Sequence, residues 1–166
     1  MRLRGLLLML GLATTGCRDS TAPLSGDLIG FWTASQRNSD GTVYQSILSL
    51  DPAGTFTREW RDYASGPVNG LGALTAYIIT DGTFSVRGDS VFMRATTVRN
   101  WDRDFNGGAV TITPVTTGVG PFGYGGARYE ARRDSLILHF ISYPADAPVE
   151  TSEAFARTYL AVSVTR

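Results

Sequence analysis

Apolar and polar residues alternate along most of the chain after Ser25, which is the pattern of strands with one buried face. Short clusters of Gly, Pro, Asp and Asn interrupt the alternation and mark turns; Asp40-Gly41 is the strongest hairpin signal among them. The pattern predicts eight or nine antiparallel strands. They are expected at about 28–37, 42–50, 55–63, 74–87, 90–99, 109–117, 127–132, 135–143 and 158–165.

The connections between these strands favour an all-β fold over one that mixes strands and helices. No convincing amphipathic helix lies between the strands, although one or two helical turns are expected within 151–156. A bulge is expected near Asp81-Gly82. A meander of this length can close into an up-and-down barrel and so remove its edge strands, with a β-sandwich as the alternative.

Composition limits the classes of partner. The chain has 166 residues, which is enough for one domain with a sizeable core. Its formal net charge is zero, so no basic footprint points to a nucleic-acid partner. The balance of 43% hydrophobic and 18% charged residues is ordinary for a globular domain. We expect no cofactor and a monomer.

The first residues have the layout of an export signal. Arg2 and Arg4 precede an apolar stretch at 6–13, which is too short to span a membrane and ends before Cys17, the only cysteine. Small residues before a cysteine resemble the lipobox of bacterial lipoproteins, although Thr14 stands where Leu is usual. The alternative is an ordinary secretory signal with a cysteine nearby.

The lipobox resemblance implies three segments and a location. Residues 1–16 would be the cleaved signal peptide, 17–27 the tether that begins at the diacylated Cys17, and 28–166 the domain. More than one acyl chain, such as palmitate, gives stable anchoring. The expected location is therefore the bacterial envelope, anchored to a membrane and most simply to the outer membrane facing the periplasm.

Several phrases in the chain resemble the calycin superfamily, in particular bacterial lipocalin-like lipoproteins. They are Gly30-Phe31-Trp32 on the opening strand, the hairpin phrases at 48–56, 81–92 and 129–138, and an arginine close to the last strand. The likeness spans roughly 28–166.

This resemblance implies a contact at the narrow end of the barrel. An arginine from near the last strand would pack on Trp32, with Arg157 as the first candidate and Arg166 as the second. Gly30 would leave the space beside the indole. The Thr-Asp-Tyr motif of central lipocalins is absent, because Thr80-Asp81 is followed by Gly82.

Arg58 is the candidate for ligand binding. It alternates with Phe56 and Trp60 on what we expect to be the inner face, where a charge must be paired or hydrated. One reading makes it a hook for an anionic group such as a fatty-acid carboxylate; the other places Arg58 outside the barrel or at its rim. The expected cavity lining consists of Trp60, Tyr77, Phe84, Met93 and Phe140.

A calcium loop is a second, weaker candidate. Asp102, Asp104, Asn106 and Gly107 fit the opening of a D-x-D-x-N-G loop, whose alternate oxygens converge on one cation. Thr113 occupies the position where a bidentate Glu belongs, so a solvated turn is the simpler interpretation and no metal site is expected.

No catalytic set is evident in the sequence. His139 is the only histidine, so there are too few ligands for a zinc site and no partner for a Cys-His pair. The sequence therefore predicts a non-catalytic binding module for a small apolar or amphipathic molecule. The alternative is a structural lipoprotein with a side-chain-filled barrel that docks an envelope partner.

Overall fold

The computed structural model describes residues 26–68, 70–115, 126–142 and 148–159, and every regular element among them except one 3-10 turn is a strand. The strands are β1 (Gly30–Arg37), β2 (Val43–Leu50), β3 (Thr55–Tyr63), β4 (Leu74–Arg87), β5 (Ser90–Asp102), β6 (Thr111–Pro114), β7 (Ala127–Ala131), β8 (Ser135–Ser142) and β9 (Val149–Thr158). The 3-10 turn η1 (Asn106–Gly108) lies between β5 and β6.

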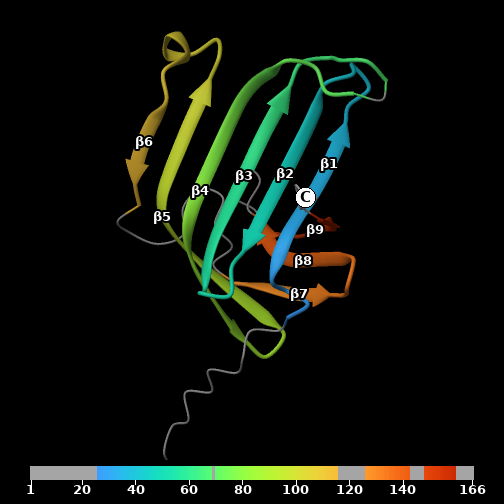
Figure 1. The fold of residues 1–166 in the computed structure, drawn as a ribbon, viewed down its shortest axis with the longest axis vertical. Coiled ribbons are helices and arrows are strands. Elements are labelled where there is room, and N and C mark those ends of the chain that lie inside the picture. Colours follow the sequence, from blue (N-terminus) through green and yellow to red (C-terminus); the bar gives the residue numbers. More distant parts are fainter. Residues whose placement is uncertain (1–25, 69, 116–125, 143–147, 160–166) are drawn as a thin grey trace, which may run out of the picture.

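Eight of these strands form a closed antiparallel barrel. The order runs β1, β2, β3, β4, β5, β7, β8, β9, and β9 pairs with β1 to complete the ring (Figure 1). The remaining strand, β6, pairs with β5 alone among the described strands, and forms an extra hairpin beside the barrel. The predicted barrel is therefore confirmed, and the sandwich alternative is wrong.

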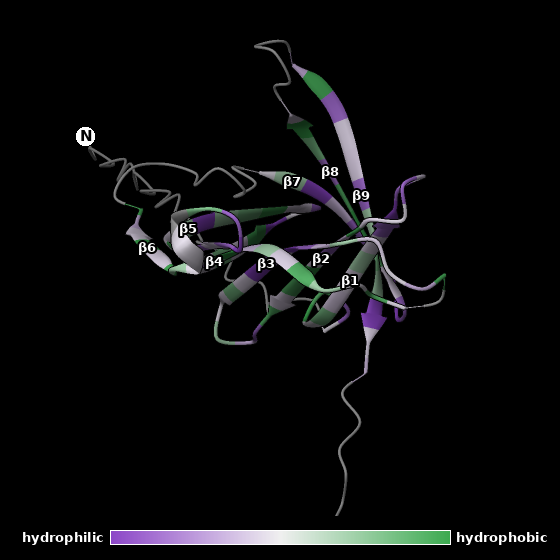
Figure 2. Cartoon of the chain, turned by 90° about the horizontal axis from the view of Figure 1, so that it is seen from above, coloured by the Kyte–Doolittle hydropathy of each residue, from purple (hydrophilic) through white to green (hydrophobic). Residues whose placement is uncertain are grey.

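The barrel is closed at one end and splayed at the other. Within the part of the chain that the structure describes, β1 pairs with β9 only through Phe31–Thr33, and β5 pairs with β7 only through Ser90 and Val91. Beyond these short seams, β8 and β9 diverge from the sheet that β1 to β6 form (Figure 2). We call the end with the β2–β3 turn at 51–54 the closed end, and the end with the β1–β2 turn at 38–42 the open end.

The apolar core fills the closed end. Alternation places one side chain in two on the inner face, and there these side chains are almost wholly buried. The cluster consists of Leu28, Trp32, Leu48, Leu50, Phe56, Phe84, Val91, Met93, Ala127, Leu136, Leu138 and Phe155. Burial of this apolar surface is the main favourable term in holding the strands together.

Trp32 and Arg157 seal the closed end together. The Arg157 guanidinium lies 4.4 Å from the centroid of the Trp32 ring, and the Trp32 Nε1–H donates to the carbonyl of Leu28 at 2.9 Å. Arg157 also donates to the carbonyl of Asp27, so the chain before β1 is fixed across the end. Arg157 is thus the arginine that packs on the tryptophan.

The backbone conformation of Gly30 accounts for glycine at the start of β1. Its φ is +145°, a conformation that residues with a side chain rarely adopt. A Cβ would make only an ordinary contact, 3.5 Å from the Arg157 Nη1, so the expectation that this glycine leaves space beside the indole is wrong.

The predicted bulge is present, and the strand that holds its extra residue determines which side chains of β4 face inward. The register between β4 and β5 shifts at Asp81 and Gly82, and the extra residue, Thr96, belongs to β5. A Cβ on Gly82 would lie 2.1 Å from the Arg94 carbonyl oxygen and 2.7 Å from the Phe56 ring. Only glycine fits at this close approach of two strands.

The last third of the chain departs from prediction. The final described strand is β9 at Val149–Thr158, where we expected a loop with helical turns followed by a strand at 158–165. β5 continues to Asp102 instead of ending near 99, and the strand expected at 109–117 is reduced to β6 outside the barrel. Hydrogen-bonding partners on β8 and β1 decide the position of β9, and local propensity does not. β4 likewise pairs with β5 as far as Asp102.

Several predictions fall outside the described residues. They concern the signal segment 1–16, Cys17 with most of its tether, and Arg166. Within the residues that the structure covers, no helix is long and apolar enough to cross a membrane.

Candidate functional site

The inner face of the barrel changes from apolar to polar above the closed end. Next to the core it carries Ser46, Arg58 and Thr80, each at most 6% exposed. Arg58 on β3 pairs directly with Leu48 on β2 and with Thr80 on β4, so the three side chains lie side by side on the inner face. A buried polar layer of this kind is stable only where its groups are hydrogen-bonded or paired.

An ion pair crosses the barrel in this layer. The Arg58 Nη2 donates to the Glu153 Oε2 at 2.7 Å, and the two side chains are 7% and 18% exposed. Arg58 comes from β3 and Glu153 from β9, on opposite walls. The guanidinium therefore has a carboxylate of this chain as its partner, and the inner-face position of Arg58 is the one that the alternation indicated.

Aromatic side chains surround the open end beyond the ion pair. Tyr44 and Trp60 are partly exposed on the inner face of β2 and β3, with ring centroids 6.1 Å apart and planes inclined at 45°. The Trp60 Nε1–H donates to the Asp62 Oδ1 at 2.9 Å, which fixes the indole against the strand. Phe140 lies on the opposite wall, on β8, and packs on the edge of the core.

Acidic groups outnumber basic ones on the inner face of the open end. The cross-strand register places Asp62 opposite Ala76, and Ala76 opposite Asp102, so both carboxylates share the face that carries Arg58. With Glu153, three carboxylates stand against one guanidinium in the described strands. The inner face of the described strands is thus negatively charged at the open end, although the formal net charge of the whole chain is zero.

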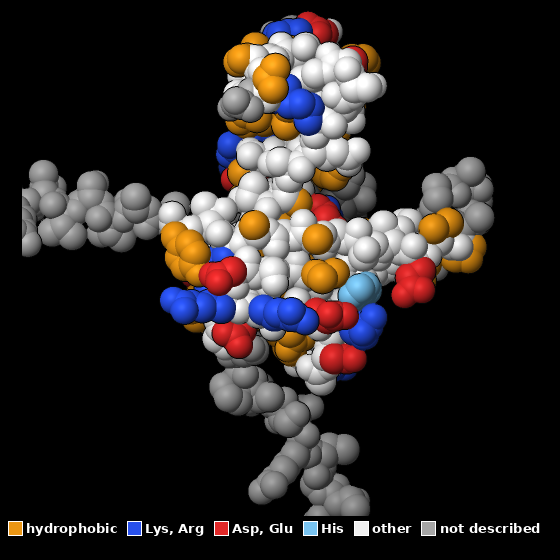
Figure 3. All heavy atoms as spheres, turned by 90° about the vertical axis from the view of Figure 1, so that its right-hand side faces the viewer, with side chains coloured by type: hydrophobic (Ala, Val, Ile, Leu, Met, Phe, Trp, Pro, Cys, Tyr) orange, Lys and Arg blue, Asp and Glu red, His pale blue; other side chains and the backbone are white. Residues whose placement is uncertain are grey.

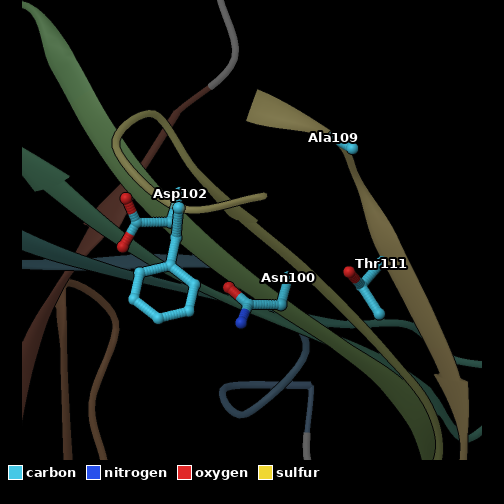
Figure 4. Close-up of a pocket in the computed structure, with 5 residues that line it drawn as sticks. Asn100, Asp102, Ala109 and Thr111 are labelled. Atoms are coloured by element: carbon cyan, nitrogen blue, oxygen red, sulfur yellow. The ribbon is translucent and has the colours of Figure 1, made fainter. Parts of the chain in front are cut away.

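A small pocket adjoins this face where β5 leaves the barrel. It has a volume of about 150 Å³ and is lined by Asn100, Asp102, Phe105, Ala109 and Thr111. Figure 4 shows Asn100 on β5 and Thr111 on β6 on its two sides. The volume is well below the ~300 Å³ that ligand pockets usually reach.

Three of the expected cavity residues have other roles. Tyr77 lies on the outer face and stacks on Trp101, with ring centroids 5.5 Å apart. Because the extra residue of the bulge is on β5, the alternation of β4 is uninterrupted, and Tyr77 and Phe84 must face opposite ways. Phe84 and Met93 are 7% and 3% exposed and fill the core.

The calcium interpretation receives no support from the loop geometry. The Asp102 Oδ1 accepts the backbone N–H of Asp104 at 2.9 Å, which is a turn-forming contact. Asp104 itself points to Arg103, at 3.3 Å. No group of three or more acidic, histidine or cysteine side chains that could hold a metal occurs in the described part of the chain.

His139 belongs to the outer surface. It lies on β8 with its Nε2 3.1 Å from the Glu130 Oε1, and Arg128 approaches the same carboxylate at 3.6 Å. Figure 3 shows the histidine in pale blue near acidic and basic side chains. Three residues at the open end were not anticipated, namely Tyr44, Asp62 and Glu153. Continuing the alternation of Phe56, Arg58 and Trp60 by one step would have found Asp62.

No family model matches the chain, and no curated protein matches it in sequence.

Proposed function

We propose that this protein is a non-catalytic binding module that holds a small amphipathic molecule at the open end of its barrel. The observation that carries the proposal is the graded inner face. Apolar side chains pack the closed end, a charged pair crosses the middle, and partly exposed aromatic side chains stand above it. A ligand there would contact both apolar surface and polar groups, which is the usual composition of small-molecule sites.

We further propose that the protein is a lipocalin-like lipoprotein of the bacterial envelope, anchored through Cys17. The lipobox-like leader supports the anchor, and Gly30, Trp32 and Arg157 support the likeness to lipocalins. Loss of membrane association in a Cys17→Ser variant would test the anchor. A variant that stays with the membrane would contradict it.

Native mass spectrometry of the protein from its own host tests the binding function. We expect a co-purifying small molecule whose occupancy falls in a Trp60→Ala variant. Trp101→Ala is the matched control, because Trp101 stacks on the outer face and should leave occupancy unchanged. A clean apo mass, together with no binding of added amphiphiles, would overturn the proposal.

One observation favours a docking function as the second candidate. The hairpin of β5 and β6 exposes Phe105, Val110 and Ile112, which are 70%, 50% and 64% exposed. Exposed apolar side chains grouped in this way often mark an interaction surface. Replacing Ile112 with Ser would weaken co-purification of an envelope partner if docking is the function, and would leave amphiphile binding intact.

A further inference from the structure

We propose that the open end of the barrel selects cationic amphiphiles, such as a molecule with an apolar chain and an ammonium head, over neutral and anionic ones. This inference rests on the proposed binding function and assigns the charge class of its ligand. It reverses the expectation from sequence that Arg58 captures a carboxylate.

The first argument is the charge around the open end. At the open end, the inner face of the described strands carries Asp62, Asp102 and Glu153 and one basic side chain, Arg58; the other inward arginine, Arg157, lies at the closed end. Charges on low-dielectric walls that are partly shielded from water interact more strongly than charges on an open surface. The resulting field attracts a cation and repels an anion.

The second argument is the pair of aromatic rings beside one of these carboxylates. Tyr44 and Trp60 lie 6.1 Å apart, Tyr44 is 38% exposed, and Trp60 donates to Asp62. A ring face within about 6 Å of an ammonium stabilises it, and tryptophan does so best. The two ring faces and the Asp62 carboxylate would together stabilise the positive charge of an alkylated ammonium group.

The third argument is the arginine itself. Arg58 already donates to Glu153 at 2.7 Å in a layer that is nearly buried. A ligand carboxylate that bound the same guanidinium would lie close to the Glu153 carboxylate, which would repel it and already offsets the charge of Arg58. Anion binding is therefore disfavoured even though the layer contains a guanidinium.

The apolar part of such a ligand has a complementary surface. Ile78 lies opposite Trp60 on β4, Val98 lies opposite Thr80 on β5, and both are partly buried on the inner face. Phe140 adds an apolar wall from β8. A short alkyl chain would lie along these side chains, and its ammonium would face Tyr44 and Trp60.

Three eight-carbon probes test the charge class on the full chain. Octyltrimethylammonium, octanol and octanoate share one chain length and differ in head-group charge at about pH 7. Titration calorimetry below micellar concentrations should give octyltrimethylammonium an affinity about 10-fold above octanol, with octanoate weakest. Equal affinities, or tightest binding of octanoate, would overturn this inference and leave the binding function standing. Binding of none of the three would remove both.

Two matched variants localise the effect. Asp62→Asn keeps an oxygen for the Trp60 N–H and removes one charge, so octyltrimethylammonium should bind about 3- to 10-fold more weakly while octanol is unaffected. Asp51→Asn removes an equal charge at the closed end, in the β2–β3 turn, and should change neither affinity. Equal losses in both variants would mean that general surface charge attracts the probe, and would contradict the proposed site.

Discussion

At the scale of single residues, Arg157 makes more contacts than its sequence context suggests. It lies over the Trp32 ring and donates to the carbonyl of Asp27, so it ties β9 to the start of β1. Replacing Arg157 with Ala should lower the free energy of unfolding by about 1–2 kcal/mol, since a partly desolvated cation–π contact and a hydrogen bond are lost. Urea denaturation followed by circular dichroism would measure the change.

Arg128→Ala is the control for that substitution. Arg128 is also an arginine on the barrel, but its side chain is 51% exposed and lies 3.6 Å from its carboxylate partner. A surface pair of this kind contributes at most about 0.5 kcal/mol after solvent screening. Equal losses in the two variants would show that the contact with Trp32 adds nothing to stability.

Residue-level prediction from the sequence succeeded where one strand carries its own signal. Alternation with Phe56 favoured an inward Arg58, with an outside or rim position left open, and the structure places it inward. It failed where two strands must be compared. Tyr77 was expected in the cavity beside Phe84, but the extra residue of the bulge lies on β5, so β4 alternates regularly and the two side chains face opposite ways. Glu153 was missed because its ion-pair partner is distant in the chain.

At the scale of elements, the bulge between β4 and β5 fixes how the two strands approach. Gly82→Ala would force a Cβ against the Arg94 carbonyl oxygen and the Phe56 ring. We expect a loss of about 1–3 kcal/mol in the free energy of unfolding, as for other overpacked sites. Thermal unfolding would measure it. Thr83→Ala, at the exposed neighbouring position, should cost less than about 0.5 kcal/mol, and a neutral Gly82→Ala would contradict the close approach.

The strands with clear turn signals were predicted to within a few residues, and the last one was not. Thr151-Ser-Glu-Ala-Phe-Ala lacks β-branched residues after its first position, and so it indicated a helical turn. β9 forms there because β8 offers a full row of partners from Ser135 to Ser142, and β1 offers three more. Pairing between segments distant in the chain outweighed local propensity.

At the scale of the whole molecule, stability should be distributed unevenly between the two ends. The apolar cluster lies at the closed end, whereas β6 has exposed side chains and pairs with β5 alone in the described structure. Native-state hydrogen exchange should therefore find the slowest amides in β2, β3 and β8, and fast exchange in β6. Equal protection of β6 and β2 would contradict this distribution.

The two short seams that join β7, β8 and β9 to the remaining strands have a mechanical consequence. Among the described residues, two residue pairs attach this three-stranded unit through β7 and three through β9, and both seams lie near the sealed base. An outward movement of this unit would break few backbone hydrogen bonds, but it would separate Arg58 on β3 from Glu153 on β9 and uncover Leu136, Leu138 and Phe155. Resistance to opening therefore comes from the buried ion pair and the apolar core more than from the sheet, while Trp32 and Arg157 hold the base.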